Sequence, residues 1–134
     1  MSSTITVAAL QDAFSNDLEA NCAKVTAAVA RAAAGGAQVI LPPELFESHY
    51  FCKTEKAGPF RDAFPTAEHP AVQAMQAAAK AHGVVIPTSF FERDGPHFYN
   101  SLAMIDADGA LLGVYRKSHI PDGPGYQEKY YFRP

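Results

Sequence analysis

Two charged residues stand where predicted strands end, and their side chains could together support acid-base chemistry. Glu44 follows the apolar run at 38–41 and a Pro-Pro pair, and Lys117 follows the apolar run at 110–115. In α/β sheets, ligands bind at the carboxyl ends of strands. A carboxylate there can take a proton, and an ammonium can stabilise negative charge that develops on an oxygen. Spacing alone leaves open the alternative that both side chains are simply solvated at strand ends.

The histidines and cysteines do not form a recognisable metal or nucleophile motif. His49, His97 and His119 lie in different segments without a pair at i and i+4, which argues against a zinc site. Cys22 and Cys52 belong to no CxxC motif, so reduced thiols are the simpler interpretation. Cys22 falls on the apolar stripe of a predicted helix, which is typical of a buried core thiol. The sequence also contains no phosphate-cradling glycine loop and no GxSxG motif.

The first part of the sequence predicts a strand, a helix and a second strand. The β-branched and apolar run at 4–10 is typical of a strand that is covered on both faces. Asn16 is expected to cap the following helix with Glu19 as its reciprocal partner, and the Gly-Gly pair at 35–36 ends that helix. A short strand at 38–41 follows, and the two prolines after it end the strand by removing hydrogen-bond donors.

The second part predicts one more helix and three more strands. Segment 70–82 begins with proline and is followed by glycine, which marks both ends of a helix, and its Met and Ala stripe is expected in the core. The runs at 84–91, 98–105 and 110–115 are separated by turn sequences and predict an antiparallel meander. Because helical crossovers join parallel strands, we expect a mixed sheet that is parallel first and antiparallel later.

Composition limits the classes of protein to which this chain can belong. Its 134 residues are 48% hydrophobic and 19% charged, which fits one folded domain and not a disordered tail. Eleven Lys and Arg against fourteen Asp and Glu give a net charge of −3, so no basic surface is expected to attract nucleic acid. The first residues lack signal-peptide features, and no apolar run approaches the ~20 residues that span a bilayer. We therefore expect a cytoplasmic protein without nucleic-acid or membrane partners.

The chain resembles the nitrilase (carbon-nitrogen hydrolase) superfamily, and within it the N-carbamoylputrescine amidases. The resemblance rests on LPPELFESHYFC, on HGVVIPTSFFERDGPHFYNSLAMIDADGALLGVYRKSH and on YRKSHIPDGPGYQEKYYF, and it covers the whole chain. It implies an α/β fold, namely the N-terminal part of an α-β-β-α nitrilase-type sandwich, with a mixed sheet and two helices. Residues 1–134 are then expected to be the N-terminal portion of a single, longer hydrolase domain.

The resemblance also implies a Glu-Lys-Cys catalytic triad, of which this chain carries two members. Glu44 in ELFE matches the general base, and Lys117 in YRKSHIP matches the lysine that stabilises the tetrahedral oxyanion. The segment with the nucleophilic cysteine is expected outside this chain, and Cys52 matches a different position. A second carboxylate that buttresses the site and two aromatic residues of the substrate pocket complete the expected set: Glu128, Tyr50 and Tyr126.

By the same resemblance, the complete enzyme is expected to hydrolyse the carbamoyl C–N bond of N-carbamoylputrescine to putrescine, ammonia and carbon dioxide, in polyamine synthesis. A thiolate attacks the ureido carbon, a carboxylate takes the proton and later activates water, and a lysine offsets the charge on oxygen. The expected partner is a small ureido or amide substrate, with no metal or organic cofactor, and the full-length form is expected to be a homo-oligomer. The alternatives are β-ureidopropionase, ω-amidase and a non-catalytic truncated half-domain.

Two further expectations concern the folded chain. Glu44 and Lys117 are expected to converge at one rim of the sheet, because both follow strand ends. Two helices leave part of a five-stranded sheet without cover, so we also expect an exposed apolar patch. This patch is expected to include Val7, Ile86 and the aromatic residues of the tail at 118–134.

Overall fold

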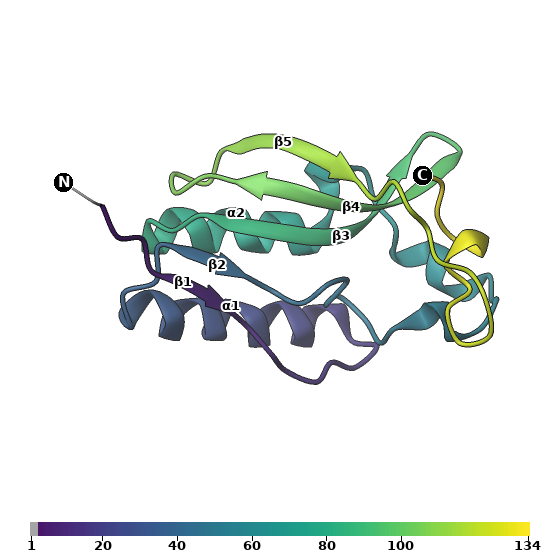
Figure 1. Cartoon of the computed structure of the whole chain (residues 1–134), viewed down its shortest axis with the longest axis horizontal. Coiled ribbons are helices and arrows are strands. Elements are labelled where there is room, and N and C mark those ends of the chain that lie inside the picture. Colours follow the sequence, from purple (N-terminus) through teal and green to yellow (C-terminus); the bar gives the residue numbers. More distant parts are fainter. Residues whose placement is uncertain (1–2) are drawn as a thin grey trace.

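The computed structural model describes residues 3–134 as an α/β chain (Figure 1). Its elements in chain order are β1 (Val7–Ala9), α1 (Leu18–Ala34), β2 (Val39–Leu41), 3₁₀ turns at Phe51–Lys53, Gly58–Asp62 and Thr66–Glu68, α2 (Pro70–His82), β3 (Ile86–Asp94), β4 (His97–Ile105), β5 (Leu111–Arg116) and a last 3₁₀ turn at Glu128–Tyr130. The order and type of the helices and strands agree with the prediction. None of the helices within this range has the length and apolar character that a bilayer crossing requires.

The strands form the mixed arrangement that the sequence predicts. β1 and β2 pair in parallel, with Val7 opposite Val39, and β3, β4 and β5 form an antiparallel meander. A parallel bridge between Val39 and Val85 connects the two parts, and the N–H of Ile40 donates to the carbonyl of Val85 at 2.9 Å. The helical crossovers after β1 and β2 account for the parallel part, because a crossover returns the chain in its original direction.

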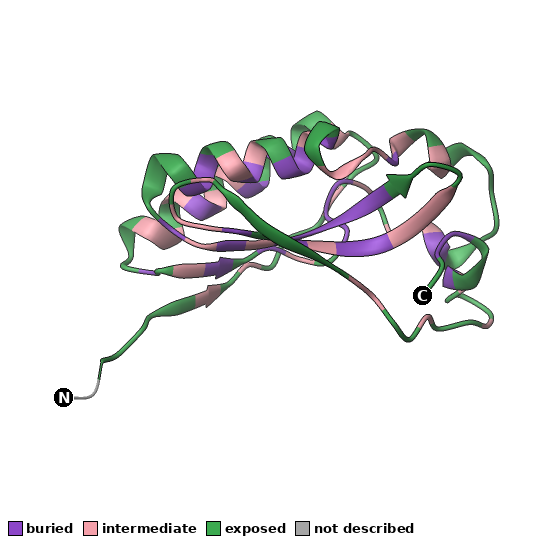
Figure 2. Cartoon of the chain, turned by 90° about the horizontal axis from the view of Figure 1, so that it is seen from above, coloured by how far each residue is buried: buried purple, intermediate pink, exposed green. Residues whose placement is uncertain are grey.

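The main hydrophobic core lies between the sheet and the two helices, which share one side of it (Figure 2). Successive side chains of a strand point to opposite faces, so every second strand residue meets the helices. Ile40, Ile86 and Ile105 occupy such positions and are fully buried. The helices contribute the predicted apolar stripes: Cys22, Val25 and Val29 from α1, and Val72, Met75 and Ala79 from α2.

Helix α1 has a different N-cap from the expected one. The expectation for Asn16 is wrong, because the side chain of Asp17 accepts the hydrogen bond from the N–H of Ala20 at 3.0 Å. Asn and Asp cap helices about equally well, so the sequence offered two adjacent candidates. With Asp17 as the cap, Glu19 is the second helical residue instead of the third, and it does not occupy the capping-box position.

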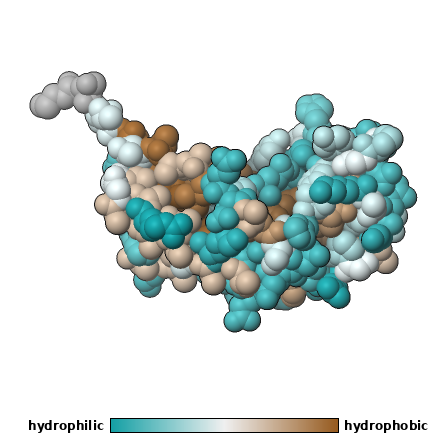
Figure 3. All heavy atoms as spheres, turned by 90° about the horizontal axis from the view of Figure 1, so that it is seen from below, coloured by the Kyte–Doolittle hydropathy of each residue, from teal (hydrophilic) through white to brown (hydrophobic). Residues whose placement is uncertain are grey.

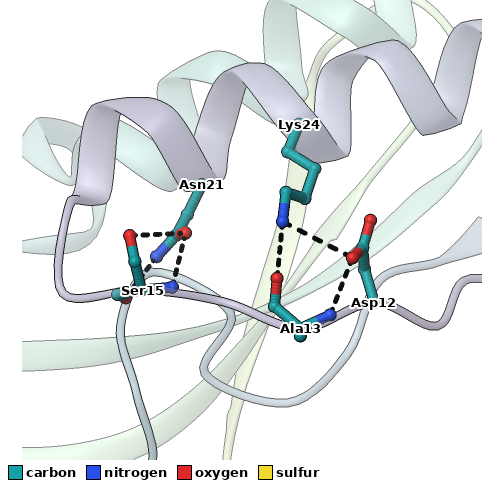
Figure 4. A network of polar contacts seen from close by, with 5 residues as sticks. All are labelled: Asp12, Ala13, Ser15, Asn21 and Lys24. Atoms are coloured by element: carbon teal, nitrogen blue, oxygen red, sulfur yellow. Dashed lines mark hydrogen bonds and ion pairs between the residues drawn. The ribbon is translucent and has the colours of Figure 1, made fainter.

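Polar contacts join α1 to the loop before it (Figure 4). The buried side chain of Asn21 accepts from the N–H of Ser15 at 3.1 Å and donates to the carbonyl of Ser15 at 2.8 Å. The ammonium of Lys24 donates to the carbonyl of Ala13 at 2.6 Å and lies 3.4 Å from a carboxylate oxygen of Asp12. These contacts satisfy backbone groups of an irregular segment and hold it against the helix.

Helix α2 spans the predicted residues because strong local signals mark both of its ends. Proline at the first helical position costs no hydrogen bond, and Gly83 adopts the left-handed backbone that ends the helix, with φ of 63°. The next strand, β3, begins two residues later than predicted and is longer. It continues to Asp94 because its pairing with β4 runs up to the turn, where Asp94 lies opposite His97.

A second cluster, made largely of aromatic side chains, holds the C-terminal tail. Figure 1 shows the tail beside the segment between β2 and α2. Tyr131 and Phe132 are buried, and they pack edge-on against Phe51 and Phe91, respectively. The expectation that the tail aromatics join an exposed patch is therefore wrong for these two residues. Side chains of the segment between β2 and α2 pack against them. The sequence of this segment has no periodic pattern that could have predicted the contact.

The sheet face opposite the helices is uncovered within the described residues (Figure 2). Val7, Leu41 and Met104 lie on this face, because they alternate along their strands with residues that face the core, and they are 70%, 45% and 37% exposed. The expectation that the first strand is covered on both faces is therefore wrong. Ile86 belongs to the opposite face and is buried, so its place in the expected patch is wrong as well. Figure 3 shows hydrophobic side chains gathered beside the described start of the chain.

The 134-residue chain is expected to self-associate as its concentration rises, because side chains such as Val7 and Leu41 expose apolar surface to water. Light scattering across a concentration series measures this association. Val7→Lys places a charge on the exposed face without touching the core, so it should lower the apparent mass at a given concentration. A chain that remains monomeric through the whole series would contradict the expectation.

Candidate active site

Glu44 lies in the turn after β2, at the carboxyl end of that strand. Its side chain is 58% exposed, and one of its oxygens, Oε1, has two donors. The amide of Asn100 donates to this oxygen at 2.6 Å, and the ammonium of Lys117 donates to it at 3.2 Å. Glu44 and Lys117 thus meet at one rim of the sheet, where the sequence analysis expected them to converge.

Lys117 directly follows β5 and lies between two carboxylates. Its backbone N–H continues the strand pairing by donating to the carbonyl of Asn100 at 2.9 Å. Its ammonium is 3.2 Å from Oε1 of Glu44 and 2.9 Å from Oε2 of Glu128. Partial burial alone would lower the pKa of Lys117, but the hydrogen bonds and charges of the two carboxylates raise it above its usual value. Lys117 therefore stays positively charged at neutral pH.

Glu128 begins the last 3₁₀ turn and reaches the site from the tail. It is 4% exposed, and its Oε1 accepts from the hydroxyl of Tyr50 at 2.8 Å while its Oε2 accepts from Lys117. A buried carboxylate needs such partners, because an unpaired charge in the interior is costly. Burial, and after it the bond to Glu128, raises the pKa of Tyr50, which keeps its hydroxyl protonated as a donor. The ring of Tyr126 lies 6.4 Å from that of Tyr50 and is largely exposed.

Asn100 contacts Glu44, although the sequence analysis did not single it out. It lies on β4 and is 5% exposed, and a buried amide in a strand was the one signal that could have identified it. Asn100, Glu44 and Lys117 line a cavity of about 260 Å³. The other lining residues are Ser89, Ser101, Leu102 and Tyr115. A smaller cavity of about 170 Å³ is lined by Glu44 and Tyr50 among others, so Glu44 borders two cavities.

Arg116, the last residue of β5, anchors the strand end that carries Lys117. Its guanidinium contacts both oxygens of Glu92, at 2.9 and 2.7 Å, and one oxygen of Asp94 at 2.8 Å. It also lies 3.8 Å from the ring centre of Tyr99. Bidentate, charge-assisted bonds of this kind fix geometry as well as adding energy, so they tie the end of β5 to β3.

Neither cysteine is poised to act as a nucleophile. Cys52 is fully buried in the aromatic cluster, and burial raises the pKa of its thiol to about 12. Cys22 lies in the main core, where burial raises its pKa to about 11. Because the thiolate is the reactive form of cysteine, both thiols are unreactive at neutral pH.

The histidines do not gather at the candidate site. His49 lines the smaller cavity beside Glu44, whereas His119 lines a separate cavity near the end of the tail and His97 begins β4. Among residues 3–134, no group of three or more His, Cys, Asp or Glu side chains is arranged to hold a metal ion.

The arrangement brings a base and a fixed cation together beside open cavities. Glu44 is exposed enough to take a proton from a group that enters, and the charge of Lys117 is of the kind that can stabilise a negative oxygen. Glu128 balances that charge and limits where the ammonium can move. Within the described residues both cysteines are buried, so this pair has no accessible thiol beside it.

Comparisons with known proteins cover nearly the whole chain. The carbon-nitrogen hydrolase family matches residues 6–134. The chain is 53% identical to the N-carbamoylputrescine amidase of Arabidopsis thaliana over 130 residues, which are 97% of this chain and 44% of that protein. It is 50% identical to the citrullinase of Francisella tularensis subsp. tularensis, over 97% of this chain and 46% of that protein. The crystal structure of a carbon-nitrogen hydrolase from Helicobacter pylori G27 matches with a TM-score of 0.89 and 30% identity, over 97% of this chain and 45% of that one. The chain thus spans less than half the length of these relatives.

Proposed function

Because the chain belongs to the carbon-nitrogen hydrolase family, we propose that the complete protein hydrolyses the carbamoyl C–N bond of N-carbamoylputrescine. The contact between Oε1 of Glu44 and Nζ of Lys117 carries this proposal, since it brings a base and an oxyanion-stabilising cation within reach of one reacting group. The 53% identity to the Arabidopsis N-carbamoylputrescine amidase supports the choice of substrate.

In the proposed reaction, Glu44 takes the proton of a cysteine thiol, and the thiolate attacks the ureido carbon. The ureido oxygen becomes negative in the tetrahedral intermediate, and Lys117 stabilises it. The C–N bond then breaks, Glu44 returns the proton to the departing nitrogen, and the acyl group remains on the cysteine. Water that Glu44 activates hydrolyses this covalent intermediate, which frees the thiol and leaves a carbamate. The carbamate then loses carbon dioxide and so releases the second nitrogen. The net reaction consumes water and releases putrescine, ammonia and carbon dioxide.

Three further residues have proposed supporting roles. Glu128 keeps Lys117 protonated and in place through the 2.9 Å contact between them. Tyr50 and Tyr126 line the substrate pocket. Because the hydroxyl of Tyr50 is already engaged by Glu128, the ring of Tyr50 is the part that it offers to a substrate.

The nucleophilic cysteine is proposed to lie in a part of the domain outside residues 1–134, which would then be the N-terminal portion of a single domain. The burial of Cys22 and Cys52 supports this, as does the coverage of only 44% of the Arabidopsis relative. The encoding reading frame offers a direct test. It is expected to continue after Pro134 into a strand that bears a cysteine.

Hydrolysis of citrulline is a second candidate function, favoured by the 50% identity to the Francisella citrullinase. Citrulline carries the same ureido group, so Glu44 and Lys117 would act on it in the same way. The two substrates differ at their far ends, where citrulline has a carboxylate beside its amine. The remaining alternatives are β-ureidopropionase activity, ω-amidase activity and a non-catalytic half-domain.

Ammonia release by the complete protein distinguishes these activities. The substrates to compare are N-carbamoylputrescine, citrulline, β-ureidopropionate and an ω-amide, each measured as kcat/KM. The highest value is expected for N-carbamoylputrescine. A higher value for citrulline would favour the second candidate, and no hydrolysis of any substrate would overturn the proposed function.

Replacing Cys52 with alanine is expected to leave kcat of the complete protein unchanged, because a buried, protonated thiol cannot attack the substrate. The lost packing should lower the free energy of unfolding by about 1 kcal/mol. Ammonia release and thermal unfolding of the two proteins measure these effects. If Cys52→Ala abolished turnover in a protein that remained folded, Cys52 would be the nucleophile after all.

A further inference from the structure

The position of Glu44 depends on the turn that carries it. Its side chain is largely exposed, so the backbone of this turn determines where the carboxylate lies. The next residue, Leu45, has a left-handed backbone with φ of 49°, although it is not a glycine. Such a conformation costs an L-residue roughly 1–2 kcal/mol, so surrounding contacts must hold it.

Two hydrogen bonds attach this turn to the side of β3 that does not pair with β4. The N–H of Leu45 donates to the hydroxyl of Ser89 at 3.0 Å. Two residues further along β3, the N–H of Phe91 donates to Oε1 of Glu47 at 2.7 Å. The bridge between Val39 and Val85 lies before this point and the bridge between Phe64 and Glu92 lies after it. Between them, the carboxylate of Glu47 accepts the hydrogen bond that a neighbouring strand would otherwise accept.

Glu47 is a charged type of residue in a buried position, where a side chain that only fills space would normally be apolar. It is 2% exposed, and within the described part of the chain its Oε2 has no hydrogen-bond partner. Burial raises the pKa of Glu47 to about 7, because the interior disfavours the charged form of its carboxyl group. An apolar side chain would fill the same space without that cost, but it would leave the N–H of Phe91 buried and unpaired, at roughly 1–3 kcal/mol.

A buried histidine completes the surroundings of Glu47. His69 is fully buried, and its Nε2 lies 3.7 Å from Oε1 of Glu47. Its Nδ1 accepts from the N–H of Ala71 at the start of α2, so the proton of the neutral ring is on Nε2, on the side of Glu47. The rings of Phe64 and Phe90 pack edge-on around the imidazole. Glu47 is therefore enclosed by groups that cannot move aside easily.

We propose that Glu47 is a positioning residue for Glu44: by binding the N–H of Phe91, its buried carboxylate holds the strained turn so that the carboxylate of Glu44 meets Lys117. The effect on catalysis rests on the function proposed above, whereas the effect on the turn does not. Glu47 touches no reacting atom in this role.

Three variants of the complete protein test the proposal. Glu47→Met keeps the size but removes the oxygen acceptor, and Glu47→Gln keeps an oxygen acceptor. Met75→Ala is a control that destabilises the core by truncating a side chain of α2 and leaves the carboxylate of Glu47 in place. Glu47→Met is expected to lower kcat on N-carbamoylputrescine by about 100-fold with a small change in KM, as a misplaced catalytic group does. Glu47→Gln is expected to restore most of kcat, and Met75→Ala to keep it.

Hydrogen exchange, followed by mass spectrometry, tests the turn independently of activity. Peptides that cover 44–48 and 89–91 are expected to exchange faster in Glu47→Met than in Glu47→Gln or Met75→Ala. Unchanged exchange in Glu47→Met would overturn the proposal whatever the activity, as would an unchanged kcat in an active enzyme. If the parent protein hydrolyses none of the ureido substrates, the proposed function fails while the exchange result still decides the role of Glu47.

Glu47→Asp covers the case in which Glu47→Met does not fold. It keeps the carboxylate but withdraws it by one methylene from the N–H of Phe91. The same faster exchange at 44–48, together with a kcat reduced by about tenfold or more, is expected. Normal exchange and normal kcat in Glu47→Asp would overturn the proposal.

Discussion

Replacing Glu44 with glutamine is expected to lower kcat of the complete protein by about 10²–10⁴, the usual contribution of a general base. Glutamine keeps the size of the side chain and an oxygen that can accept from Asn100, so the turn should retain its shape. Only the capacity to take a proton is lost. Steady-state ammonia release from N-carbamoylputrescine measures kcat, and circular dichroism verifies folding.

A matched control distinguishes the loss of the general base from the effect of removing any one negative charge. Glu19→Gln makes the same chemical change on the exposed first turn of α1 and is expected to keep kcat. A near-normal kcat for Glu44→Gln would remove Glu44 from the mechanism. Loss of activity in both variants would point to charge and not to base catalysis.

The second large effect is expected for Lys117→Ala, with kcat lower by about 10²–10³, because loss of one oxyanion donor costs roughly 3–4 kcal/mol of transition-state stabilisation. The same ammonia assay measures it. The KM should change less than kcat, because the charge on the oxygen develops only in the transition state. Near-normal turnover would rule out Lys117 as the oxyanion-stabilising group.

Because Lys117 contacts Glu128, replacing Lys117 is expected to affect the stability of the fold as well as catalysis. Glu128 is buried, so removing the ammonium leaves its carboxylate with the hydroxyl of Tyr50 and without a cation. Lys117→Ala should therefore also lower the unfolding temperature. Lys117→Arg keeps a positive charge beside Glu128 but changes its geometry, so it should recover stability more than kcat. Equal recovery of both would mean that the charge alone matters.

The two main residues of the candidate site could be predicted from the sequence, whereas the residues that support them could not. Glu44 and Lys117 each follow the end of a strand, and the sequence predicts that these ends lie at one rim of the sheet. Their direct contact depends on the tertiary structure, because β3 and β4 lie between β2 and β5. Asn100 lies inside a strand, and only its pairing with Lys117 across β4 and β5 brings it to Glu44. Glu47 and His69 are separated in sequence, and nothing in their spacing indicates that they share one buried space.

The helices show the same division between local and tertiary information. Helix α2 matches its predicted range because proline and glycine act within a residue or two of where they stand. For α1, Asn16 and Asp17 are equivalent as caps by local chemistry, so the sequence does not choose between them. In the structure Asp17 caps the helix, and contacts from Asn21 and Lys24 hold the preceding loop (Figure 4).

By itself, the sequence determined the order and type of the elements, the strand ends that carry Glu44 and Lys117, and the absence of a metal or CxxC motif. These depend on backbone preferences and on periodicity, which act over a few residues. The tertiary structure decided which face each strand residue takes. Ile86 is buried and Val7 exposed, although both are apolar strand residues, because side chains alternate between faces and only packing selects the face that meets the helices. The tertiary structure also determined that aromatic residues of the tail are buried against other segments, and that the turn carrying Glu44 has a strained backbone. Both features result from contacts between segments far apart in the chain.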